Sequence, residues 1–70
     1  MVISSKDFGQ LICSRRMKLG WSQAKLAERL VVSARALRNW EHGTAIPNFF
    51  DGLRCCRVLG IDPADLMTRR

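Results

Sequence analysis

Length, composition and charge set the first limits on this protein. The chain has 70 residues, of which 47% are hydrophobic, so we expect one folded domain over residues 1–70 rather than a disordered segment. Twelve lysines and arginines against six acidic residues give a net charge of +6 and a sequence pI of about 10.3, which favours a polyanionic partner.

Several classes of site and location are disfavoured by the sequence. Cys13, Cys55 and Cys56 are odd in number and two are adjacent, which is a poor disulfide framework, and His42 is not spaced with them as a zinc ligand would be. We predict reduced cysteines, no metal, no cofactor and no catalytic site. No apolar run approaches the ~20 residues that cross a bilayer, and no signal peptide is visible. We therefore predict a cytoplasmic protein without a membrane partner.

Apolar residues recur at helical spacing nearly throughout, which predicts an all-α fold of five short helices. The first helix follows an N-cap at Ser4 or Ser5 and stops at Gly20. Its inner face is expected to contain Phe8, Leu11, Ile12 and Leu19.

Two further serines predict the starts of the next helices. The second helix begins at the N-cap Ser22 and runs to about Leu30, and the third begins at the N-cap Ser33 and ends near His42. Gly43 ends the third helix, and a loop follows. The residues expected to point inward are Leu26, Ala27, Leu30, Leu37 and Trp40.

The last third of the chain predicts a fourth helix and a short fifth one. The fourth follows the N-cap Asn48 and closes at Gly60, and the fifth begins at Asp62. The fourth helix carries an apolar stripe of Phe49, Leu53, Cys56 and Leu59. Three residues fall off the core pattern and could form an exposed patch for a partner or a second copy: Phe50, Val58 and Met67.

The outward face of the third helix carries the side chains with the clearest chemistry. With Leu37 and Trp40 inward, the helical period turns Ala34, Arg35, Arg38 and Asn39 outward. Arginine can form two hydrogen bonds with O6 and N7 of guanine, and asparagine can form two with N6 and N7 of adenine. The small Ala34 and Ala36 would let the backbone approach a groove. In the neighbouring helix, the first amides at Ser22 and Gln23 can take a phosphate oxygen.

A composite motif spans these two helices. It consists of Ser22-Gln23-x-x-Leu26-Ala27, Val32-Ser33 and Leu37-x-x-Trp40-Glu41-x-Gly43, with Pro47 following. The chain resembles the lambda-repressor-like, Cro-type (Xre) helix-turn-helix family over about residues 8–66. The resemblance implies a compact five-helix DNA-binding domain, with its helix-turn-helix at about residues 22–42, of a kind that commonly binds palindromic operators as a dimer.

The resemblance also implies roles for individual residues. Those placed for base reading are Ser33, Ala34, Arg35, Ala36, Arg38 and Asn39. Those placed for the DNA backbone are Ser22, Gln23, Lys25, Thr44 and Asn48. Arg16 and Glu41 match an ion pair that ties the first helix to the end of the third.

Two positions depart from the family pattern. Val31 stands at a turn position where the family usually has glycine, because the backbone there requires a positive φ. Either Val31 is strained or the turn is remodelled. Gly52 stands where the family tends to have a large apolar residue, and it either makes room for Trp40 or Phe50 or weakens its helix.

The function predicted from these features is sequence-specific binding of double-stranded operator DNA by a transcriptional repressor of a prokaryote or phage. The third helix, residues 33–42, would lie in the major groove, and the domain would act as a homodimer. The alternative is an antitoxin-like or adaptor module whose main partner is another protein, with DNA binding secondary. A second rival, a single-strand or RNA binder, lacks exposed aromatics interleaved with its basic residues.

Overall fold

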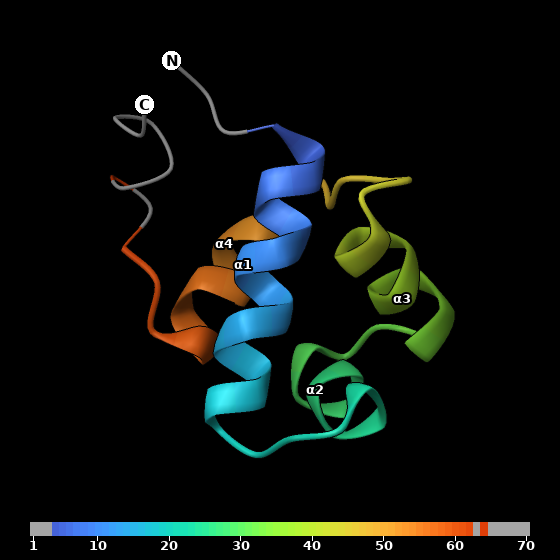
Figure 1. Cartoon of the computed structure of the whole chain (residues 1–70), viewed down its shortest axis with the longest axis vertical. Helices are drawn as coiled ribbons and strands as arrows, with labels where there is room; N and C mark the ends of the chain where they lie inside the picture. Colours follow the sequence, from blue (N-terminus) through green and yellow to red (C-terminus); the bar gives the residue numbers. More distant parts are fainter. Residues whose placement is uncertain (1–3, 63, 65–70) are drawn as a thin grey trace.

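The computed structural model describes residues 4–62 and Ala64, and these residues form an all-α fold (Figure 1). Its helices are α1 (Ser5–Lys18), α2 (Gln23–Leu30), α3 (Ala34–His42) and α4 (Phe49–Leu59). The described residues thus contain four helices rather than the predicted five. The fifth was expected from Asp62 onward, and it falls largely on residues 63 and 65–70, outside the described part. Asp62 Oδ1 accepts a hydrogen bond from the Ala64 amide at 3.0 Å.

Each helix begins at an N-cap that the sequence predicted. In every case the cap side chain accepts a hydrogen bond from the amide three residues further on, which satisfies one of the free donors of the first turn. The four pairs are Ser4 with Asp7 (3.1 Å), Ser22 with Lys25 (3.0 Å), Ser33 with Ala36 (3.0 Å) and Asn48 with Asp51 (2.8 Å). Local chemistry therefore accounts for where the helices start.

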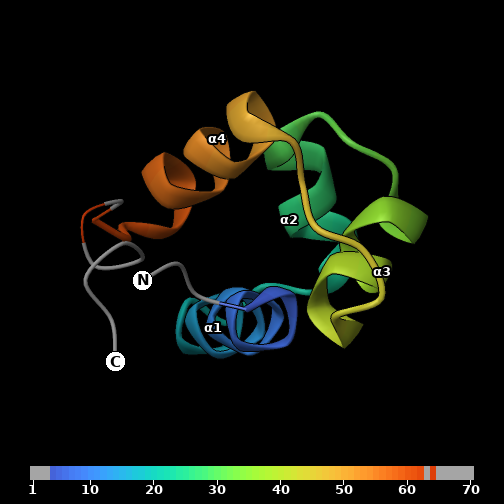
Figure 2. The same cartoon turned by 90° about the horizontal axis from the view of Figure 1, so that it is seen from above.

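The other three helices lie to one side of α1 when the molecule is viewed nearly down that helix (Figure 2). The core between them includes Phe8 and Ile12 of α1 and Leu26, Ala27 and Leu30 of α2. It is completed by Leu37, Trp40, Cys55, Cys56, Leu59 and Ile61. The predicted inward faces of α2 and α3 are confirmed.

A close approach of backbones fixes α1 against the end of α3. Gly9 lies in the middle of α1, and a Cβ at this position would run into the carbonyl oxygens of Trp40 and Glu41. The lack of a side chain at Gly9 lets the two helices touch. Of the described helices, none is long and apolar enough to cross a lipid bilayer.

Three residues predicted to lie in the core are exposed instead. Leu19 is the C-cap of α1, where the chain already turns toward α2. Phe49 and Leu53 lie in the first half of α4, whereas all buried residues of this helix lie in its second half. Gly52 offers no side chain one turn before Cys55 and Cys56, and a Cβ there would meet nothing within 4 Å. The first half of α4 therefore has no anchor in the core.

Candidate nucleic-acid interface

The turn between α2 and α3 sets the angle of the candidate reading helix. Val31 has φ 59° and ψ 46°, the left-handed conformation that favours glycine. Its amide and that of Val32 donate to the carbonyls of Glu28 and Ala27, at 3.2 and 3.0 Å. Of the two alternatives raised by the sequence, the turn keeps its positive-φ geometry and Val31 carries the strain.

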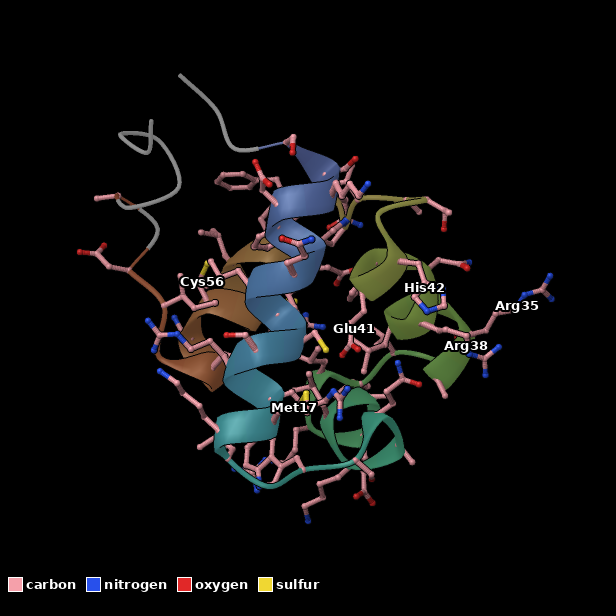
Figure 3. All side chains as sticks on the ribbon, viewed as in Figure 1. Met17, Arg35, Arg38, Glu41, His42 and Cys56 are labelled. Atoms are coloured by element: carbon pink, nitrogen blue, oxygen red, sulfur yellow. The ribbon has the colours of Figure 1, made fainter. Side chains whose placement is uncertain are left out.

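The outward face of α3 is exposed and is not covered by the described part of the chain. Leu37 and Trp40 are buried, and Arg35 and Arg38 project from the side of α3 that faces away from α1 (Figure 3). Ala34 and Asn39 are also exposed, as predicted. Neither arginine has a carboxylate partner within the described part of the chain. Two cationic groups are therefore held in solvent on one helix face.

Two other base-reading candidates are less available. Ser33 uses its hydroxyl to cap α3, where it accepts the Ala36 amide. Ala36 is half-buried and packs against the core, so it presents little of its methyl group to a groove. Of the predicted base-reading set, Arg35, Arg38 and Asn39 are the polar side chains that the structure leaves outward on α3.

The candidates for backbone contacts lie on α2, directly after α3 and at the start of α4. Lys25 is exposed on α2, and Ser22 caps the start of that helix. Thr44 follows α3, and its hydroxyl donates to the carbonyl of Asn39 at 3.2 Å. Asn48 is exposed at the start of α4 and uses its side-chain oxygen as the cap. The first amides of α2 have no intrahelical partners, so they can receive an anion.

An ion pair joins α1 to the end of α3 at the positions that the resemblance indicated. Arg16 Nε donates to Glu41 Oε2 at 2.8 Å and Arg16 Nη2 to Glu41 Oε1 at 3.1 Å. Arg16 Nη1 also donates to the Trp21 carbonyl at 2.8 Å. The Glu41 side chain is only 3% exposed, so this pair is held away from solvent.

Gln23 also forms a hydrogen bond with this ion pair, a contact that the sequence did not predict. Its Nε2 donates to Glu41 Oε1 at 3.0 Å, which links the first residue of α2 to the ion pair between Arg16 and Glu41. One amide proton of Gln23 is therefore committed inside the protein, while its carbonyl oxygen and second amide proton are not used by this bond. No spacing rule relates residues 18 positions apart, so only the docked helices reveal the contact.

The environment of the pair shifts its proton affinities. Burial by itself would raise the pKa of Glu41, but hydrogen bonds from Arg16 and Gln23 outweigh it and hold the pKa below its ordinary value. The hydrogen bond to Glu41 raises the pKa of Arg16. Both groups are charged at neutral pH, and Glu41 stays ionised well into the acid range.

The described residues form no candidate metal-binding site. Residues 4–62 and Ala64 bring together no group of three or more histidine, cysteine, aspartate or glutamate side chains that could hold an ion. Cys55 and Cys56 are buried, and burial raises the pKa of Cys55 to about 12 and raises that of Cys56. These two thiols are protonated core residues.

Two helices joined by a strained turn, with a basic outer face on the second, define a helix-turn-helix DNA-binding domain. The family model for helix-turn-helix domains matches residues 14–66, and the chain belongs to this Xre/lambda-repressor-like family. The comparison with curated proteins found no match, and neither did the comparison with solved structures. The family is one of DNA-binding domains of the transcription-regulator type and is not typically enzymatic.

Proposed function

We propose that this domain binds double-stranded operator DNA in a sequence-specific manner and acts as a transcriptional repressor, with α3 in the major groove. The observation that supports the proposal most directly is the pair of outward guanidinium groups of Arg35 and Arg38, neither of which has a carboxylate partner among the described residues. A helix that is anchored by Leu37 and Trp40 presents them at a fixed angle. A single α-helix fits the width of the major groove.

The side chains divide between reading and positioning. Arg35 and Asn39 would read base edges, with Arg38 beside them. The start of α2 (Ser22, Gln23), with Lys25, Thr44 and Asn48, would hold phosphates. Gln23 can donate its remaining amide proton to a phosphate while Glu41 holds the other one in place. Phosphate contacts would supply much of the affinity, so binding should weaken steeply with salt.

The domain would bind as a homodimer, because one module of this size contacts few base pairs, and two copies related by a two-fold axis match a palindromic site. Selection of bound sequences from a random DNA pool tests both points together. A palindromic consensus supports operator binding by a dimer. Recovery of unrelated sequences would contradict sequence-specific recognition.

Two substitutions separate base reading from phosphate contact. Arg35→Ala should cost about 1–3 kcal/mol on the selected operator and relax the preference at one base position. Lys25→Ala should weaken binding to operator and random DNA alike. It should also reduce the slope of log K against log salt concentration by about one, because one phosphate contact is lost. If Arg35→Ala weakened both kinds of DNA equally, the arginine would not read bases.

A further inference from the structure

The first half of α4 exposes large apolar side chains. Phe49 is 72% exposed, Phe50 is 74% exposed and Leu53 is 40% exposed. The two phenylalanine rings pack against each other edge to face, with centroids 5.5 Å apart, so they form one surface. We call these three residues the α4 patch. Single exposed apolar residues are ordinary, but a contiguous set of this kind marks an interaction site.

A groove runs from the α4 patch along the helix. Its two adjoining hollows are lined by Phe50, Leu53, Arg54, Cys56, Arg57 and Ile61. Leu53 and Arg57 line both hollows, so the two adjoin each other along α4. Apolar lining comes mainly from Leu53, Cys56 and Ile61, and Arg54 and Arg57 supply polar lining.

The edge of the groove is basic. Arg54 is already engaged, because its Nη1 donates to the Leu30 carbonyl at 2.9 Å and lies 3.4 Å from Asp51. Arg57 is exposed, and within residues 4–62 and Ala64 no carboxylate pairs with it. An occupant that brings a carboxylate to Arg57 while it fills the groove with apolar side chains would complement both features.

We infer that the α4 patch and its groove bind an amphipathic helix of another protein that carries acidic residues beside its apolar face. Helix-in-groove binding places apolar anchors at i, i+3, i+4 and i+7 into a hydrophobic groove. A second copy of this chain fits less well. A two-fold contact would pair this surface with itself, and the residues that line the groove include two arginines but no carboxylate to meet them, in a protein of net charge +6.

The groove leads away from the proposed base-reading residues, although the α4 patch begins next to Asn48, a proposed phosphate contact. Cys56, which lines the groove, lies on the opposite side of the molecule from Arg35 and Arg38 (Figure 3). The Cys56 end of the groove and the α3 arginines therefore lie on different faces of the molecule. The inference does not depend on DNA binding, and its test uses no DNA.

The probe is a synthetic helical peptide with leucines at i, i+3, i+4 and i+7 and glutamates on the flanking positions. It is titrated into the ¹⁵N-labelled full chain, and the affinity and the perturbed amides are measured. We expect shifts confined to α4 and the residues that line its groove. Arg57→Glu should weaken binding by about fivefold, the upper end of what one exposed ion pair supplies. Phe50→Ser should weaken it further, because an aromatic ring that lines the groove is lost.

Arg38→Glu is the matched control, since it makes the same charge change on α3. It should alter the peptide affinity by less than about twofold, because Arg38 does not line the groove. Equal losses for Arg57→Glu and Arg38→Glu would overturn the inference, as would equal binding of a peptide with lysines in place of the glutamates. Absence of binding would do the same. A dimer of the unbound chain in sedimentation equilibrium that Phe50→Ser dissolves would assign the patch to a second copy instead.

Discussion

Replacement of Val31 by glycine should stabilise the domain. Val31 has φ 59°, and a left-handed conformation costs an L-residue about 1–2 kcal/mol relative to glycine. The β-branched side chain is 81% exposed, so its removal loses little packing. Glycine also gains freedom in the unfolded chain, which opposes the benefit by about 0.4–1 kcal/mol.

The difference between these two effects spans about 0–1.6 kcal/mol, and its midpoint is a net gain of about 0.8 kcal/mol in the free energy of unfolding. For a domain of this size that midpoint corresponds to a rise in Tm of about 3–6 °C. Urea titrations followed by tryptophan fluorescence, together with thermal unfolding by circular dichroism, measure both quantities. An unchanged m-value would show that the compactness of the unfolded state is the same in both proteins.

The neighbouring valine provides a matched control. Val32 lies outside the positive-φ region, and its half-buried side chain packs against the core. Val32→Gly should therefore destabilise the domain, although the substitution is chemically identical. Val31→Asn should lie between wild type and Val31→Gly, because asparagine tolerates the left-handed region better than valine does. A Tm for Val31→Gly at or below that of wild type would refute the strain argument.

Three further predictions follow from the described contacts. Gly52→Ala should raise the free energy of unfolding by about 1 kcal/mol, because a Cβ there meets nothing within 4 Å and alanine favours the helix. A variant that urea titrations show to be less stable than wild type would contradict this. The depressed pKa of Glu41 means that its ion pair contributes stability above the ordinary glutamate pKa of 4.5 and loses it as the pH falls through the lower folded value. Urea midpoints between pH 7 and pH 3 should therefore fall less for Glu41→Gln than for wild type, and parallel curves would argue against the pair. Cys55 and Cys56, whose pKa values are raised, should resist iodoacetamide in the folded protein and react after unfolding. The half-buried Cys13 should react first. Early adducts on Cys55, detected by mass spectrometry, would contradict the burial of these two thiols.

Local signals account for what the sequence predicted well. The N-caps Ser22 and Ser33 and the inward residues Leu26, Leu37 and Trp40 are set by hydrogen bonding and by a period of 3.6 residues. These rules operate within one or two turns of a helix. The direction in which the α3 arginines point follows from the same period, so the outward face of α3 could be predicted before the structure was known.

The contacts that the sequence missed depend on how distant segments dock. Gln23 reaches Glu41 because the start of α2 lies beside the end of α3, and Gly9 matters because α1 crosses the backbone at Trp40. A glutamine at the start of a helix can equally well face solvent, and a glycine within a helix can equally well be a weak point of that helix. Neither residue type carries a signal that specifies a partner so far along the chain.

The error on α4 has a single physical origin, and it explains the most distinctive surface of the molecule. Helical spacing alone placed Phe49 and Leu53 on the core stripe with Cys56. The spacing does not include the effect of Gly52, which removes the side chain that would hold the first half of α4 on the core. Without that anchor, the helix packs only through its second half, and the two phenylalanines face solvent. A larger apolar residue at this position would have space to fill, so Gly52→Leu should draw α4 toward the core and reduce the exposure of Phe49. Amide hydrogen exchange in the first turn of α4 would report this movement, because it would slow. Unchanged exchange there would mean that the exposure of the α4 patch does not depend on Gly52.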